Sequence, residues 1–250
     1  QRTFKDESNK DLWPAFIRDA VTPAAKKYGL EAKIDEDGAV SQLRAAVISR
    51  LGFDGEDQNV INKAKEQTQV YLTNPQKVDP YLAGVYLRLA AFHGDKALLD
   101  QFMTTFKTTK DPQVRTNMLA AMGFFGESEL QNAVLAYSLT DEVTASDMRT
   151  ILSGQSYTEE RQALFIDWVY NNYDKVTASL PPFFIPNLPY FTTVGCDAKS
   201  LATTQNFFND KISEVPGYSR TLSKLEESTL DCIALKKREL DSVNSFLNSK

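Results

Sequence analysis

The stretch Val85–Phe106, VYLRLAAFHGDKALLDQFMTTF, has the pattern of two short amphipathic helices joined by a tight turn. In both halves apolar side chains recur every three or four residues, which is the period of one helix face. Between them lies His93-Gly94-Asp95. We expect Gly94 to adopt the left-handed conformation that ends the first helix, and Asp95 to cap the second. One such pair cannot bury both apolar faces by itself, so the stretch predicts neighbours of the same kind.

Two other places repeat this pattern of an apolar helix, a glycine, an acidic residue and a second helix. Together with Gly94, the glycines Gly55 and Gly126 recur near the roughly 40-residue period of paired-helix repeats. No stretch shows sustained strand alternation. We therefore predict an all-α chain, a degenerate HEAT/armadillo-like α-solenoid of paired helices, with residues 1–250 forming one repeat domain. An irregular globular helical domain is the alternative.

Local start signals place several of the predicted helices. A capping residue precedes an apolar periodic run at four positions, and proline occupies the first helical position after two of them. These positions are Asp57, Asp79-Pro80, Asp111-Pro112 and Thr158. Four prolines make residues 180–190 irregular, and aromatic residues are frequent there. We expect this segment to be an ordered crossover packed on the helices, and an apolar wall that touches a peptide or partner domain is the alternative.

Charge and hydropathy restrict the partners of the chain. It has 250 residues, a formal net charge of −5 and a pI of about 5.1. An acidic balance argues against binding nucleic acid or an acidic membrane surface. No apolar run approaches the roughly 20 residues of a membrane-spanning helix. Because the chain begins at Gln1 rather than Met, we expect a fragment of a larger protein.

The two cysteines, Cys196 and Cys232, are too few for a disulfide framework. We expect a reducing compartment, with a leaning toward the cytoplasm, and leave open a single bridge between them. Cys196 follows a glycine but has no evident partner base. An enzyme with a new type of site around Cys196 is therefore the weakest of the functional hypotheses.

No recognisable catalytic machinery is encoded in the sequence. His93 is the single histidine, whereas a catalytic zinc site takes three protein ligands, often two of them histidine. The HExxH zinc motif, the GxSxG nucleophile elbow, the Walker loop and the dinucleotide-binding GxGxxG are all missing. We therefore predict no catalytic residue, no metal ligand and no cofactor in this chain.

Several short motifs resemble, in order and spacing, the C-terminal helical domain of the M1 family of zinc aminopeptidases, in its puromycin-sensitive and endoplasmic-reticulum branch. The motifs are Leu43-Arg44, Ser49-Arg50-Leu51-Gly52, Val85-Tyr86, His93-Gly94-Asp95, Asp111-Pro112, Leu119-Ala120-Ala121-Met122-Gly123, Ser153-Gly154, Trp168, Phe207-Phe208, Pro216 and Arg220-Thr221-Leu222. The chain departs from the family at Asn172-Tyr173, where Asn-Trp is common, and in its proline-rich segment.

The resemblance implies a non-catalytic domain of HEAT-like helix pairs that closes over the active site of a larger enzyme. It implies that the zinc and the exopeptidase motif lie in an N-terminal catalytic domain, which is the first expected partner. Peptide substrates are the second. An isolated array would expose its end faces, through which copies could associate.

Three residues are candidates for contact with the distal part of a peptide substrate. Arg44 and Arg88 each interrupt an otherwise apolar helix, and a guanidinium suits the free carboxylate of a peptide. Tyr86 combines an aromatic ring with a polar tip. A structural salt bridge between repeats is the alternative for each arginine. A free-standing α-solenoid that binds another protein is the alternative for the whole chain.

Overall fold

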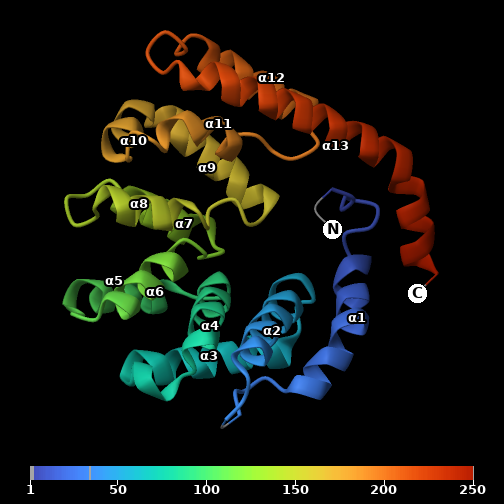
Figure 1. Ribbon diagram of the computed structural model, residues 1–250, viewed down its shortest axis with the longest axis vertical. Helices are drawn as coiled ribbons and strands as arrows, with labels where there is room; N and C mark the ends of the chain where they lie inside the picture. Colours follow the sequence, from blue (N-terminus) through green and yellow to red (C-terminus); the bar gives the residue numbers. More distant parts are fainter. Residues whose placement is uncertain (1–2, 34, 250) are drawn as a thin grey trace. The chain divides into compact units, whose positions relative to one another are not determined.

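The structure is a computed structural model that describes residues 3–33 and 35–249, and these residues are helical wherever they form regular structure. They divide into two compact units. We call Asp6–Gln131, with the last residues from Leu247 onward, the N-terminal unit. We call Asn132–Phe246, with the residues before Asp6, the C-terminal unit. The predicted all-α, solenoid-like fold is confirmed (Figure 1), whereas the assignment of residues 1–250 to one domain stays a prediction.

Paired helices in two layers build the N-terminal unit. The central helix α4 packs against α2 on one side and α6 on the other, while α3 packs on α4 and α5 packs on α6. The elements are α1 (Leu12–Tyr28), α2 (Gly38–Ser49), the π-helix η1 (Arg50–Asp54), α3 (Gln58–Thr73), the 3-10 helix η2 (Pro75–Lys77), α4 (Pro80–Phe92), α5 (Lys96–Thr108) and α6 (Pro112–Met122).

Aspartate caps start the helices of this unit. The Asp79 carboxylate accepts the N–H of Tyr81, and Pro80 follows at the first helical position. Asp57, Asp95 and Asp111 cap α3, α5 and α6 in the same way. These starts confirm the sequence predictions, because the signal and the helix it begins are adjacent in the chain.

Close approach, rather than a left-handed backbone, explains the repeated glycines. The prediction for Gly94 is wrong, since positive φ among the glycines of the described chain occurs at Gly29. A Cβ at Gly94 would lie 2.9 Å from the Ala90 carbonyl oxygen. A Cβ at Gly126 would lie only 2.3 Å from the carbonyl oxygen of Phe92, at the end of α4. Gly126 therefore lets successive helix pairs approach each other, and Gly94 allows the tight turn that follows α4.

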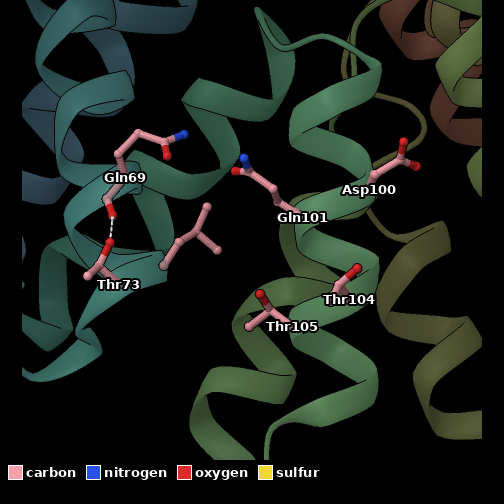
Figure 2. Close-up of a pocket in the computed structure, with 7 residues that line it drawn as sticks. Gln69, Thr73, Asp100, Gln101, Thr104 and Thr105 are labelled. Carbon is pink, nitrogen blue, oxygen red and sulfur yellow. Dashed lines mark hydrogen bonds between the residues drawn. The ribbon is translucent and has the colours of Figure 1, made fainter.

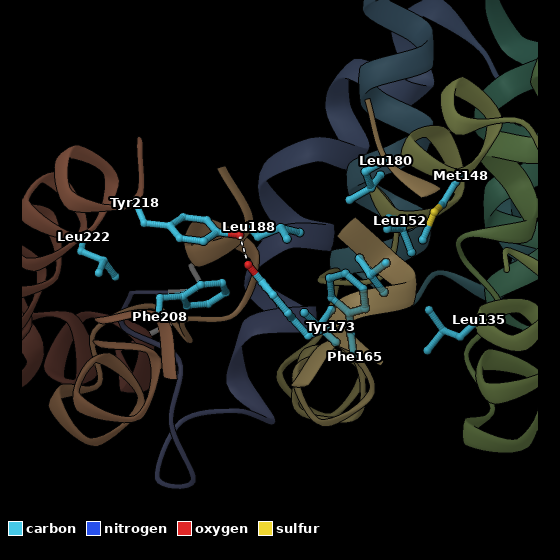
Figure 3. Close-up of a cluster of buried hydrophobic side chains, with 12 residues drawn as sticks. Leu135, Met148, Leu152, Phe165, Tyr173, Leu180, Leu188, Phe208, Tyr218 and Leu222 are labelled. Carbon is cyan, nitrogen blue, oxygen red and sulfur yellow. Dashed lines mark hydrogen bonds between the residues drawn. The ribbon is translucent and has the colours of Figure 1, made fainter. Parts of the chain in front are cut away.

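The C-terminal unit is also built of helices, and its core is rich in aromatic side chains. Its elements are α7 (Ser128–Tyr137, which begins in the N-terminal unit), α8 (Ala145–Leu152), α9 (Glu159–Asn171), α10 (Tyr173–Ser179), the 3-10 helix η3 (Ile185–Asn187), α11 (Leu188–Phe191), α12 (Ala198–Asn209) and α13 (Gly217–Asn248). Figure 3 shows its core, in which Phe208, Tyr218 and Leu222 meet Tyr173 and Phe165. The Tyr173 and Tyr218 hydroxyls lie 3.0 Å apart.

The proline-rich crossover is ordered, as its structural interpretation expects. Leu188 is 1% exposed, and the Phe184 ring packs on Phe191 at a centroid distance of 5.3 Å. Two aromatic side chains of the segment nevertheless face solvent, Phe183 at 73% and Tyr190 at 41% exposure. The segment is therefore anchored in the core at Leu180, Leu188 and Pro189, while Phe183 and Tyr190 face outward.

Candidate functional site

Arg44 is fully buried and has a structural set of partners. Its guanidinium donates to both carboxylate oxygens of Glu36, at 2.5 and 2.6 Å, and to the carbonyl oxygen of Tyr28 from Nε and Nη2. The side chain has 0% exposure. The hydrogen bonds that Arg44 donates to Glu36 lower the pKa of the Glu36 carboxyl and raise the pKa of Arg44. This buried ion pair joins α2 to the α1–α2 connection and does not lie between repeats.

Tyr86 is also an interior residue. Its ring lies in the core of α4 at 2% exposure, and its hydroxyl donates to the carbonyl oxygen of Leu30. Burial raises the pKa of this hydroxyl above its ordinary value of 10.0. Arg44 and Tyr86 thus hold the connection between α1 and α2, and the ion pair from Lys63 to Glu31 ties the same connection to α3.

Arg88 differs from both, because it reaches the open surface of α4. It is partly exposed, and its guanidinium carbon lies 5.7 Å from the centroid of the Phe124 ring. Partial burial lowers the pKa of the Arg88 guanidinium. Within the described part of the chain, no ion pair joins Arg88 to an acidic residue. A cation stacked on an aromatic ring without a carboxylate partner is suited to bind an anion.

Two other residues of α4 that are not buried, Tyr81 and Gly84, lie on the same side of the helix as Arg88. Tyr81 is 51% exposed, and Gly84 lies one turn before Arg88. From α6, Asn117 is the nearest neighbour of Gly84, with its Oδ1 4.0 Å from the Cβ that an alanine would add. We call Tyr81, Gly84, Arg88, Asn117 and Phe124 the α4 face. It combines one cation, two aromatic rings, an amide and a position without a side chain.

Sequence reasoning missed Tyr81, Asn117 and Phe124. Tyr81 lies seven residues before Arg88, which is two helical turns, so the helix period could have placed them on one face. Phe124 and Asn117 lie on the next helix pair, and no local signal connects them with Arg88. The α4 face is therefore a product of packing between neighbouring repeats.

A polar groove of about 440 Å³ runs along the other layer, between α3 and α5. Figure 2 shows Gln69 and Gln101 reaching toward each other across it, with Thr73, Thr104 and Thr105 below. Asp100 belongs to its lining and pairs with Lys96 at 2.5 Å. These side chains can form hydrogen bonds but offer no nucleophile beside a base.

Over residues 3–33 and 35–249, no three histidine, cysteine or acidic side chains gather in a way that could hold a metal ion. His93 is an exposed residue at the end of α4, and its ring packs edge-on against Phe92 at 5.1 Å. Partial burial lowers the pKa of His93, and nearby Lys65 lowers it further.

Cys196 is bonded to Cys232 in a disulfide, so it offers no free thiolate. The hypothesis of an enzyme built around Cys196 is therefore wrong. Among the helices that the structure describes, none is both long and apolar enough to cross a bilayer.

Comparison with known families agrees with the architecture. The family model described as the ERAP1-like C-terminal domain matches residues 1–230, which is nearly the whole chain. The match includes all elements of the N-terminal unit up to Gln131 and extends into α13. The all-α paired helices and the family match together show that this chain belongs to the family of ERAP1-like C-terminal domains.

Proposed function

We propose that this chain is the non-catalytic C-terminal domain of an M1 zinc aminopeptidase. In this proposal it encloses the active-site chamber and contacts the distal part of peptide substrates. Family membership supports the association with a catalytic domain, since a C-terminal domain of an aminopeptidase implies one. The zinc ion and the residues that cleave the peptide bond would belong to that N-terminal catalytic domain, and this chain would supply binding and enclosure.

The observation that carries the proposal is the environment of Arg88. Its guanidinium is partly withdrawn from water and rests against Phe124, and no acidic side chain of the described residues neutralises it. Electrostatic attraction is stronger where water is partly excluded, so an incoming carboxylate would gain more here than at a fully exposed lysine. An unmodified peptide carries a free carboxylate at its distal end, and this is the anion that we expect Arg88 to bind.

The neighbours of Arg88 suit the rest of a peptide. Tyr81 and Phe124 offer aromatic surface for an apolar side chain, and Asn117 offers an amide for backbone hydrogen bonds. The Asn117 amide is itself oriented, because its Nδ2 donates to the Tyr71 hydroxyl at 2.8 Å. Gly84 leaves room for a main chain to approach α4. We assign contact to Arg88 and a positioning role to Arg44 and Tyr86, which hold the α1–α2 connection.

The test uses the full-length enzyme with Arg88→Ala and a matched control, Arg115→Ala. Arg115 is also stacked on a phenylalanine, 3.8 Å from the Phe106 centroid, but it faces α5 rather than the α4 face. We expect Arg88→Ala to lower kcat/KM for long peptides by roughly 10-fold or more, the value of a charged hydrogen bond. A small aminoacyl substrate, which is too short to reach the domain, should be hydrolysed normally by both variants.

Equal behaviour of the two variants on long peptides would contradict the proposal for Arg88. A parent gene without a catalytic domain would instead favour the alternative, a free-standing α-solenoid that binds another protein. In that case binding of a partner protein, rather than of a peptide, would be measured with variants of the α4 face.

A further inference from the structure

The last helix, α13, is anchored over only part of its length. Near its start Tyr218, Leu222 and Leu225 are buried against the C-terminal unit, and Thr229 is the last buried position of that series. From residue 230 to residue 246 no side chain of the helix is buried. Full burial therefore stops at Thr229, and over the next 17 residues α13 has only half-buried apolar side chains, such as Ile233, Leu240 and Val243, before Leu247 is buried again.

A covalent tie lies just beyond that anchored part. Cys232, three residues after Thr229, is bonded to Cys196 in the loop before α12, with the two Cα atoms 5.1 Å apart. The Cα separation lies within the usual range for a disulfide. The two cysteines are 36 residues apart in the sequence, so the bond closes a loop that contains α12 and the start of α13.

The loop that carries Cys196 is itself firmly held. Gln162 of α9 donates from Nε2 to the carbonyl oxygen of Thr193 at 2.8 Å, and the N–H of Val194 donates to the Ser200 hydroxyl of α12 at 2.8 Å. The Thr204 hydroxyl donates to the carbonyl oxygen of Thr192 at 2.6 Å. A bond from this loop to α13 therefore transmits the position of α9 and α12 to the last helix.

We propose that the Cys196–Cys232 disulfide is a structural staple that fixes the distal part of α13, and that it forms in an oxidising compartment. Formation breaks two S–H bonds and makes one S–S bond. The two protons and two electrons pass to the disulfide of a thiol–disulfide oxidoreductase, which becomes a dithiol. Persistent disulfides of this kind are rare where glutathione and thioredoxin keep thiols reduced.

This inference replaces the expectation of a reducing compartment, which rested on two cysteines being too few for a disulfide framework. It is independent of the aminopeptidase proposal, because the staple involves α12, α13 and their connection rather than the α4 face. The family match ends at residue 230, two positions before Cys232, so the bond lies partly outside what the family comparison covers.

The first arm of the test asks whether the bond exists in the cell. The full-length protein is trapped with N-ethylmaleimide as its native cells are opened, then digested without reductant and mapped by mass spectrometry. We expect the peptides that contain Cys196 and Cys232 to be found joined. Recovery of both cysteines as alkylated thiols would overturn the proposal.

The second part of the test determines which residues the disulfide stabilises. Hydrogen exchange is measured with and without dithiothreitol, on the wild type and on the Cys196→Ser/Cys232→Ser double variant. Because these are the only cysteines of this chain, the double variant is the matched control for any other effect of the reductant on it. We expect reduction to raise exchange roughly 10-fold or more in residues 192–197 and 230–246 of the wild type, with α2–α6 unchanged.

The double variant should show the faster exchange already without dithiothreitol, and reductant should not change it further. Its thermal midpoint should fall by roughly 5–10 °C, as expected for loss of a loop-closing disulfide. If the variant fails to fold, the wild-type arm with dithiothreitol still decides. Unchanged exchange in residues 230–246 after complete reduction would overturn the staple.

Discussion

The two units of this chain solve the same packing problem with different chemistry. In the N-terminal unit, aspartates cap the helices and glycines let one pair of helices approach the next. In the C-terminal unit, a tyrosine pair, a proline-rich crossover and a disulfide join elements that are far apart in the sequence. Side-chain caps start helices in both units, for example at Asp79 in the first and at Thr158 in the second, so the units differ in what joins their helices rather than in how the helices begin. A helix cap can be predicted from the sequence, whereas a contact between residues far apart in the sequence becomes visible only in the folded structure.

The largest expected effect comes from Gly126→Ala, which disturbs the close contact between helix pairs in the N-terminal unit. Gly126→Ala places a Cβ 2.3 Å from the Phe92 carbonyl oxygen, and a backbone atom cannot move away as a flexible side chain can. We expect a loss of about 3 kcal/mol in the free energy of unfolding, at the upper end for overpacking. Urea unfolding of Gly126→Ala and of the control Gly195→Ala measures this loss.

Gly195→Ala in the C-terminal unit is the matched control, because nothing lies within 4 Å of the Cβ that it adds. Its effect should stay within about 0.5 kcal/mol, as for an ordinary surface substitution. If Gly126→Ala were as stable as Gly195→Ala, the helix pairs would not approach each other as described. The difference between the units would then not lie in their glycines.

A smaller effect tests the tyrosine pair of the C-terminal unit. Tyr173→Phe removes one hydroxyl and leaves the other, on the fully buried Tyr218, without the partner 3.0 Å away. Each single substitution should lower the free energy of unfolding by about 1–2 kcal/mol, the cost of a lost buried hydrogen bond. The double variant, in which both hydroxyls are replaced, should lose less than the sum. Additive losses in this double-mutant cycle would show that the two hydroxyls do not interact.

The smallest effect concerns the ion pair of the N-terminal unit and its dependence on pH. The pKa of Glu36 is lowered by its hydrogen bond from Arg44, so the folded state binds a proton less readily than the unfolded state. The resulting stability is fully present above the ordinary pKa of 4.5 and is lost as pH falls through the lowered value. The stability difference between wild type and Glu36→Gln should therefore shrink below about pH 4.5.

Thermal unfolding of the wild type and Glu36→Gln from pH 7 down to pH 3 measures this dependence. A constant difference over the whole range would mean that the Glu36 charge does not stabilise the α1–α2 connection. Glu66→Gln is a useful reference, because Glu66 is an exposed carboxylate paired with Lys63 at the surface, 3.3 Å away.

The candidate site could be predicted only in part. Arg44 and Arg88 are equivalent in the sequence, since both interrupt apolar helices, and their roles separate only in three dimensions. Glu36, which neutralises Arg44, comes from the α1–α2 connection, whereas the neighbour of Arg88 is the Phe124 ring. A sequence pattern does not show which acidic residue will fold back on which arginine.

The fold was more predictable than the site, for the same physical reason. The starts at Asp57, Asp79 and Asp111 were predicted because a cap acts within three residues. The π-helix at Arg50–Asp54 and the bond between Cys196 and Cys232 were not predicted. Both depend on packing that brings separate parts of the chain together, which periodicity does not encode.

The most direct experiment gives the full-length enzyme the same peptide in two forms, one with a free C-terminal carboxylate and one with a C-terminal carboxamide. The quantity is the ratio of kcat/KM for the free-carboxylate peptide to kcat/KM for the carboxamide of the same sequence. We predict that the wild type and Arg115→Ala prefer the carboxylate by roughly 10-fold, and that Arg88→Ala brings the ratio close to 1. A ratio near 1 in the wild type, or an unchanged preference in Arg88→Ala, would contradict the assignment of the α4 face to the distal end of the peptide.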